Sequence, residues 1–102
     1  MTVDELKALL DAGRSPLVLD VREAPELRIA PFPFPVVHIP MRQLTARAAE
    51  LPRDRPVVCA CRSGGRSAQA VAWLKAQGFE SENLDGGILA WSRRIDPSIP
   101  QY

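Results

Sequence analysis

Two short apolar runs constrain the fold of this chain more than any other feature. Residues 17–21 and 57–60 are almost entirely apolar, which is typical of strands that are covered on both faces. Segments with apolar residues at helical spacing lie before, between and after them. Because strands that alternate with helices form βαβ crossovers, we expect an α/β fold in three layers, with a mainly parallel sheet of four to five strands flanked by helices.

Caps and breaking residues place the remaining elements. Thr2 and Glu5 form a capping-box pattern at the start of a helix over residues 2–12. The prolines between residues 25 and 40 exclude regular helix there, except for one turn around residues 25–27. The pattern then predicts a strand at 36–39, a helix over 41–51, a helix that starts after Gly65 and ends before Gly78, a weak strand at 82–84 and a short helix through Trp91.

Length and charge limit the organisation and the partners. With 102 residues the chain has room for one compact domain, so we expect residues 1–102 to form a single domain. Thirteen basic and twelve acidic residues give a formal charge of +1, and the arginines are scattered, which argues against a nucleic-acid partner. No apolar run reaches the roughly 18 residues needed to cross a bilayer, and Met1 leads into a polar helical segment. We therefore expect a cytoplasmic protein without a membrane partner.

The chain has two cysteines, Cys59 and Cys61. A disulfide between residues two apart would strain the backbone, so we interpret both as thiols, in keeping with a reducing compartment. Cys59 lies within an apolar strand, where a cysteine behaves as a small buried hydrophobe. Cys61 follows that strand, and the working sites of open parallel sheets lie outside the carboxyl ends of the strands. Cys61 is therefore the candidate reactive residue.

Residues 61–67, Cys-Arg-Ser-Gly-Gly-Arg-Ser, join this strand to the next helix. Gly64 and Gly65 allow successive backbone N–H groups to turn inward as an anion-binding nest, to which the helix adds its positive N-terminal end. Arg62 and Arg66 add charge, so the loop favours thiolate over thiol. Lowering a cysteine pKa of about 8.5 by about 2 takes the thiolate at pH 7 from ~3% to roughly three-quarters, for about 2.7 kcal/mol. Such a nucleophile needs no general base.

Four pieces of sequence together resemble one family. They are residues 20–26 (Asp-Val-Arg-Glu-Ala-Pro-Glu), residues 39–40 (Ile-Pro), residues 61–67, and residues 84–87 (Leu-Asp-Gly-Gly) followed by Trp91. In this order they make the chain similar to a rhodanese-like domain along nearly its whole length. The resemblance implies a sulfurtransferase in which Cys61 takes sulfane sulfur from a small anionic donor such as thiosulfate, holds it as a persulfide and passes it to a thiol or other nucleophilic acceptor.

The end of the chain adds a second, weaker resemblance. Residues 95–102 are similar to the ends of rhodanese domains that are fused to enzymes adenylylating sulfur-carrier proteins. This similarity implies a sulfur-carrier protein as a possible acceptor. We expect neither a cofactor nor a metal.

The resemblance also implies roles for individual residues. The loop from Arg62 through Ser67 would bind the donor and the persulfide, with Arg62 at the mouth and Arg66 fixing the loop (Arg62, Ser63, Gly64, Gly65, Arg66, Ser67). Asp20, Arg22 and Glu26 would surround the site, with Asp20 accepting hydrogen bonds from nearby loop amides and Glu26 pairing with an arginine. Ordinary capping and surface pairing account equally well for Asp20 and Glu26.

Two other functions stay open for the same fold. A cysteine-dependent phosphatase or arsenate reductase would use the same nucleophile, but relatives of that kind resemble Cys-x5-Arg, whereas four residues separate Cys61 from Arg66. The shorter loop favours a sulfur atom over a tetrahedral phosphate. A non-catalytic interaction module would fit a broken cradle, yet both glycines, Arg66 and Ser67 are present.

Several residues have competing interpretations. Cys59 is a core residue or a resolving thiol for a Cys61 persulfide, and Trp73 and Trp91 are core residues or ligand platforms. His38, the only histidine, has no evident tie to Cys61. Where the family often reads His-Ile-Pro-Gly-Ala, residues 31–35 read Pro-Phe-Pro-Phe-Pro. The sequence therefore does not determine the path of this loop. The segment is interpreted as a stiff connector or as a partner-recognition element.

Overall fold

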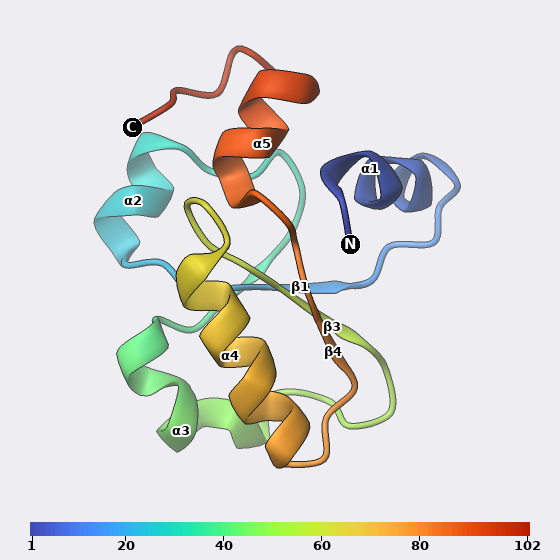
Figure 1. Cartoon of the computed structure of the whole chain (residues 1–102), viewed down its shortest axis with the longest axis vertical. Helices are drawn as coiled ribbons and strands as arrows, with labels where there is room; N and C mark the ends of the chain where they lie inside the picture. Colours follow the sequence, from blue (N-terminus) through green and yellow to red (C-terminus); the bar gives the residue numbers. More distant parts are fainter.

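A computed structural model describes all of residues 1–102 and contains one sheet of four parallel strands. The strands lie in the order β2-β1-β3-β4, and each neighbouring pair is parallel (Figure 1). The predicted three-layer α/β fold is therefore confirmed, with four strands rather than five. The strands are β1 (Leu17–Asp20), β2 (Val37–His38), β3 (Val57–Ala60) and β4 (Ser81–Asn83).

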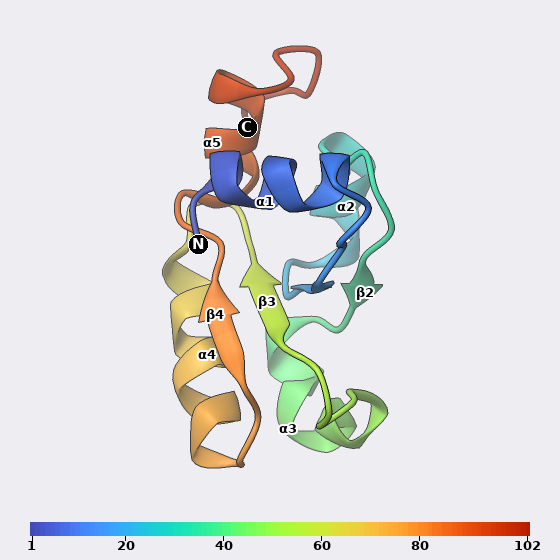
Figure 2. The ribbon, with the colours of Figure 1, turned by 90° about the vertical axis from the view of Figure 1, so that its right-hand side faces the viewer.

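Helices cover both faces of the sheet (Figures 1 and 2). Helices α3 and α4 pack on one face, and α1 and α5 pack on the other. None of the helices has the length and apolar character that a bilayer crossing requires. The helices are α1 (Val3–Asp11), α2 (Ala24–Ile29), α3 (Leu44–Arg47), α4 (Gly65–Ala76) and α5 (Gly87–Arg94), and 3-10 turns η1 (Met41–Gln43) and η2 (Ala48–Glu50) flank α3.

The two apolar runs supply side chains to both cores. Successive side chains of a strand point to opposite faces, so Leu19 and Cys59 pack with α3 and α4, while Val18 and Val58 pack with α1 and α5. All four residues of Val57–Ala60 are buried, as expected for a central parallel strand. The apolar composition that suggested these strands is therefore a consequence of their burial on both faces.

The predicted capping box at the first helix is confirmed. Thr2 Oγ1 accepts a hydrogen bond from the Glu5 amide at 3.1 Å, and the Glu5 carboxylate accepts one from the Thr2 amide at 3.2 Å. These bonds satisfy two amides that the helix itself leaves unpaired, so α1 begins at Val3. At the end of α4, Gly78 adopts φ +90° directly after the C-cap residue Gln77, as the sequence predicted.

Two helix predictions were wrong. Helix α2 spans six residues rather than one turn, because Pro25 occupies its first turn, where no amide donor is needed, and Glu23 and Glu26 cap its start. The single helix expected over residues 41–51 is broken into η1, α3 and η2. No glycine or proline lies between residues 41 and 51, so nothing in the sequence marks this break.

Candidate active site

The loop that carries Cys61 lies between the end of β3 and the start of α4, at the carboxyl edge of the sheet (Figure 1). Gly64 precedes the helix with φ +103°, a conformation that favours glycine. This turn directs the Gly64 amide back to Cys61, whose sulfur accepts its hydrogen bond at 3.1 Å. The nest expected from the two glycines therefore rests on Gly64, whereas Gly65 is the first residue of the helix.

Cys61 is 1% exposed and has donors directed at its sulfur. The Ser67 hydroxyl lies 3.3 Å from Sγ and the Gly64 amide lies 3.1 Å from it. Burial raises the pKa of Cys61, but hydrogen bonds from the Ser67 hydroxyl and from the amides of Ser67, Gly64 and Ser63 outweigh it. The pKa of Cys61 is therefore lower than that of an ordinary cysteine.

Helix α5 supports the same loop from the other side. The Ile88 amide donates to the Cys61 carbonyl at 3.0 Å, and the Leu89 amide donates to the Arg62 carbonyl at 3.1 Å. Gly87 permits this approach, because a Cβ there would lie 2.4 Å from the Cys61 carbonyl oxygen. The Gly-Gly pair after β4 thus positions the reactive loop as well as turning the chain.

Arg66 pairs with Glu26 rather than with the sulfur. The guanidinium donates from Nη1 to Glu26 Oε2 and from Nη2 to Oε1, each at 2.7 Å, and so ties α4 to α2. The Arg66 hydrogen bonds lower the pKa of Glu26 to about 2, although partial burial opposes this shift. The positive charge that the sequence placed beside Cys61 is present, but it is largely offset by a carboxylate.

Asp20 and Arg22 form a fully buried ion pair behind the site. Arg22 donates from Nη2 to Asp20 Oδ2 at 2.8 Å and from Nε to Oδ1 at 3.0 Å. Asp20 accepts one loop amide, that of Arg22 at 3.1 Å, and bonds to none of residues 61–67. His38 Nε2 contacts the Arg22 carbonyl oxygen at 2.6 Å, so it supports this segment and not the thiol.

Tyr102 joins the site although sequence reasoning did not include it. Its hydroxyl accepts from Arg22 Nη1 at 2.9 Å and donates to Glu26 Oε1 at 3.0 Å. The Arg62 guanidinium lies 5.2 Å from the Tyr102 ring centroid, and Arg62 Nε donates to the Tyr102 carbonyl. Tyr102 therefore connects both ion pairs and holds Arg62, and no local pattern signals contacts across 40 to 80 residues.

Asn83 is the second residue that sequence reasoning missed. Its Oδ1 accepts from the Ser67 hydroxyl at 2.6 Å, and its Nδ2 donates to the Gly64 carbonyl at 3.1 Å. Asn83 ends β4, the neighbour of β3 in the sheet. The strand expected at 82–84 put Asn83 in its middle, so its place at the carboxyl edge of the sheet, where such sites lie, was not apparent from the sequence.

Cys59 differs from Cys61 although only one residue separates them. It is fully buried in the core beside α4, as predicted, and its sulfur lies 3.5 Å from Ser81 Oγ. Burial raises the pKa of Cys59 to about 11, and the charge of Cys61 adds to the effect. Both cysteines are free, and only Cys61 has a lowered pKa.

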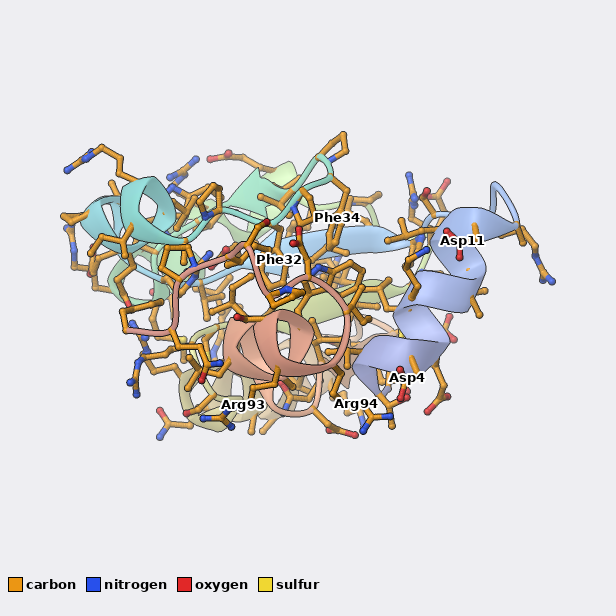
Figure 3. The ribbon with its side chains drawn as sticks, turned by 90° about the horizontal axis from the view of Figure 1, so that it is seen from above. Asp4, Asp11, Phe32, Phe34, Arg93 and Arg94 are labelled. Carbon is orange, nitrogen blue, oxygen red and sulfur yellow. The ribbon has the colours of Figure 1, made fainter.

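The two phenylalanines of the Phe-Pro segment pack against the core, whereas its three prolines are exposed. Phe32 and Phe34 lie next to α5 (Figure 3), with ring centroids 6.4 Å and 5.1 Å from that of Trp91. Phe32 also lies 5.5 Å from the Arg22 guanidinium, on which it provides an aromatic face. Trp91 is a core residue, as predicted, and Trp73 packs partly buried against the other core.

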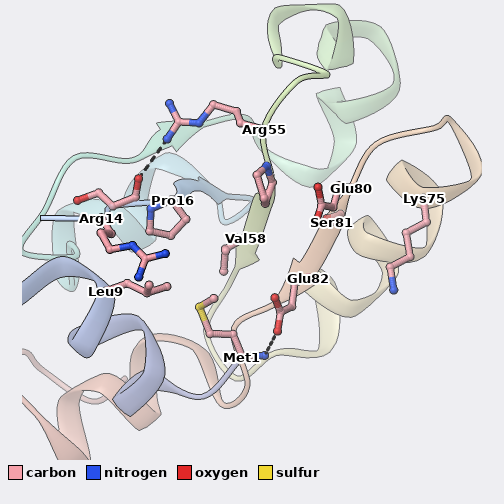
Figure 4. A pocket seen from close by; sticks show the side chains of 12 residues that line it. Met1, Leu9, Arg14, Pro16, Arg55, Val58, Lys75, Glu80, Ser81 and Glu82 are labelled. Carbon is pink, nitrogen blue, oxygen red and sulfur yellow. Dashed lines mark hydrogen bonds and ion pairs between the residues drawn. The ribbon is translucent and has the colours of Figure 1, made fainter. Parts of the chain in front are cut away.

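The cavities of the molecule lie away from Cys61. The largest, of about 660 Å³, is at the opposite end of the strands, between the start of β3 and the end of α1 (Figure 4). Residues 61–67 line none of the three cavities. No group of three or more His, Cys, Asp or Glu is arranged to hold a metal ion.

Comparison with known proteins places this site in a family. The family model of the rhodanese-like domain matches residues 2–94. The chain belongs to the rhodanese-like domain family. A rhodanese-like domain protein from Staphylococcus aureus has the same fold, with a TM-score of 0.84 and 31% sequence identity, over 89% of this chain and 88% of that one.

Two curated relatives of this rhodanese-like chain are named for sulfur transfer. A sulfurtransferase of Allochromatium vinosum is 44% identical over 81% of the chain and 78% of its own length. The probable adenylyltransferase/sulfurtransferase MoeZ of Mycobacterium tuberculosis is 36% identical over the whole chain. The chain spans about a quarter of the length of MoeZ, 26%.

Proposed function

We propose that this chain is a sulfurtransferase that carries sulfane sulfur on Cys61. The observation that carries the proposal is the surroundings of the Cys61 sulfur, which is buried and accepts hydrogen bonds from the Gly64 amide and the Ser67 hydroxyl. Neutral donors of this kind stabilise a negative sulfur without supplying a proton to a leaving group. The family and the relatives named sulfurtransferases support the same general chemistry.

The proposed reaction has two half-steps. The Cys61 thiolate attacks the outer sulfur of thiosulfate, the sulfur–sulfur bond of the donor breaks, and sulfite leaves with the electron pair. The product, Cys61–S–S⁻, keeps one negative charge, for which the loop amides from Arg62 to Ser67 are the donors. A thiolate acceptor then attacks the outer sulfur, which leaves as the acceptor persulfide and restores the Cys61 thiolate. Arg62 guides the anionic donor to the mouth of the loop.

The proposal also covers the sulfur acceptor and the cellular compartment. A thiol would take the sulfur by the step above, and the double name of MoeZ supports a sulfur-carrier protein as the partner that this sulfur finally reaches, after its C-terminus has been activated as an adenylate and with a thiol as reductant. The chemistry needs Cys61 as a free thiol, which fits a cytoplasmic, reducing environment. Residues 1–102 would act as one catalytic domain.

The contacts of Arg66 argue against a phosphatase or arsenate reductase. Both of its terminal nitrogens bind Glu26, so the guanidinium is already engaged by a carboxylate. An oxyanion of phosphate or arsenate at the Cys61 sulfur would lack the bidentate partner that such chemistry uses. The four-residue spacing between Cys61 and Arg66 points in the same direction.

The direct test is the intact mass of the reduced protein before and after brief treatment with thiosulfate. We expect the mass to rise by one sulfur atom in the wild type and in Cys59→Ser, and to stay unchanged in Cys61→Ser. A gain that survives Cys61→Ser would refute the assignment of the nucleophile. If the wild type gains no sulfur from thiosulfate or from a desulfurase persulfide but hydrolyses an aryl phosphate, the phosphatase alternative replaces the proposal.

A further inference from the structure

The single hydroxyl hydrogen of Ser67 has two acceptors within reach. Ser67 is fully buried, and its Oγ lies 2.6 Å from Asn83 Oδ1 and 3.3 Å from Cys61 Sγ. A serine hydroxyl carries one hydrogen, so it donates to only one of these atoms at a time. The direction of this hydrogen is therefore coupled to the charge on the sulfur.

The orientation of the Asn83 amide follows from a second hydrogen bond. Asn83 Nδ2 donates to the Gly64 carbonyl at 3.1 Å. Turning the amide over would place Oδ1 against that carbonyl oxygen, with two acceptors facing each other and no hydrogen between them. Asn83 Oδ1 consequently faces Ser67 for as long as the Gly64 carbonyl keeps its donor.

We propose that Asn83 is a positioning residue that holds the Ser67 hydrogen while Cys61 is a thiol and yields it to the sulfur when the thiolate forms. In the thiol, Cys61 S–H points to Ser67 Oγ and the Ser67 hydroxyl points to Asn83, so every hydrogen has an acceptor. In the thiolate, the Ser67 hydroxyl hydrogen turns to the sulfur, and Asn83 Oδ1 then faces a lone pair of Ser67 Oγ with no hydrogen between the two oxygens. Asn83 thus opposes ionisation through Ser67, while the Gly64 amide favours it.

This arrangement has a consequence for sulfur transfer, on the proposed function that Cys61 is the nucleophile. When Cys61 takes up sulfur, the negative charge moves from Sγ to the outer sulfur, and Sγ becomes a neutral and weaker acceptor. The Ser67 hydrogen then returns to Asn83. Because Asn83 disfavours the thiolate but not the persulfide, it shifts the equilibrium towards the sulfur-loaded form.

A double-mutant cycle tests the coupling, with the pH midpoint of iodoacetamide alkylation at Cys61 as the readout. Asn83→Leu removes the competing acceptor, so we expect the midpoint to fall by about 0.5 to 1 pH unit, the equivalent of one hydrogen bond. Ser67→Ala removes a donor and raises the midpoint. In the Ser67→Ala background, Asn83→Leu is expected to have no further effect, because no hydroxyl hydrogen remains to be released.

Two outcomes would overturn the inference. If Asn83→Leu lowers the midpoint equally in the wild type and in Ser67→Ala, Asn83 acts on the loop and not through the Ser67 hydrogen. A raised midpoint in Asn83→Leu would mean that the bond to Gly64 is the dominant contact. Glu82→Gln on the same strand is the matched control with no expected shift of the midpoint.

The readout separates this inference from the proposed function. Alkylation of Cys61 needs no sulfur donor, so a chain that takes no sulfur from thiosulfate but shows the coupling would refute only the function. The other groups whose charges act on Cys61 are Arg66 from α4, paired with Glu26 from α2, and Cys59 from β3. These groups are the same in the wild type, the two single variants and the double variant, so their effects on the midpoint cancel in the comparison.

Discussion

Replacing Gly87 by alanine tests whether helix α5 holds the Cys61 loop in place. Gly87 has φ +57°, and a Cβ added there would lie 2.4 Å from the Cys61 carbonyl oxygen and 2.7 Å from the Arg62 carbonyl oxygen. Both obstacles are backbone atoms, so rotation of a side chain cannot relieve the contact. The loop and the start of α5 must therefore move apart.

The size of this movement sets the loss of stability. An ordinary contact is about 3.5 Å, so the Cβ requires a shift of about 1 Å. The same shift stretches the hydrogen bonds from Ile88 to Cys61, now 3.0 Å, and from Leu89 to Arg62, now 3.1 Å, beyond their useful range. Two lost bonds at about 1 kcal/mol each and about 1–2 kcal/mol for alanine in the left-handed region give about 3–4 kcal/mol.

Gly13→Ala is the matched control for this measurement. Gly13 also has a left-handed φ of +70°, but an added Cβ would meet nothing within 4 Å, so only the conformational cost of about 1–2 kcal/mol applies. Urea unfolding should therefore separate the two variants by about 2 kcal/mol, and only Gly87→Ala should change the alkylation rate of Cys61. Equal losses of stability would refute the account of α5 as the support of the loop.

The remaining predictions concern the charged groups around the loop. Arg66→Ala is expected to raise the pH midpoint of Cys61 alkylation and Glu26→Gln to lower it, because each leaves the opposite charge uncompensated; an unchanged profile in both would remove the pair from the mechanism. The pKa of Glu26 is depressed to about 2, so its contribution to stability is present above about pH 4.5 and lost as the pH falls towards 2. With solvent screening this is worth about 1–2 kcal/mol, and acid unfolding curves of Glu26→Gln should be correspondingly flatter. Tyr102→Phe should cost about 1 kcal/mol in urea unfolding but leave the KM for thiosulfate unchanged, whereas Tyr102→Ala, which also frees Arg62, should raise that KM.

The parts of the fold that the sequence revealed are those with local causes. The apolar runs at β1 and β3 are visible because both faces of each strand are buried, and the cap at Thr2 is visible because its partner is three residues away. Helix α2 is longer than the sequence indicated because its one proline, Pro25, lies in the first turn, where it costs no hydrogen bond. The break within residues 41–51 depends on tertiary packing and has no local marker.

The residues of the candidate site also fall into two groups, those that a local sequence pattern reveals and those that only tertiary packing brings together. The cysteine, the glycine turn and the arginines could be found from the spacing of one loop, since strand, turn and helix there are continuous in sequence. Asn83 contacts the loop at Ser67, 16 residues away, and Tyr102 contacts it at Arg62, 40 residues away; an asparagine or a tyrosine alone predicts no such contact. The pairing of Arg66 with Glu26 likewise depends on how α2 packs beside α4.

These distant contacts change the electrostatic account of the thiol. Of the arginines around the cradle, Arg22 and Arg66 are each neutralised by a carboxylate, so neither presents a free positive charge to the sulfur. Stabilisation of the thiolate then falls on the amide and hydroxyl dipoles, which are held at short range by α5 and β4 and are screened by salt much less than exposed charges. Arg62 is exposed and pairs with neither Asp20 nor Glu26; its Nε donates to the main-chain oxygen of Tyr102, and its guanidinium lies 5.2 Å from the Tyr102 ring centroid. On the proposed function, the hydrogen-bond donors around the sulfur would set the reactivity of Cys61, and Arg62 would attract the anionic donor.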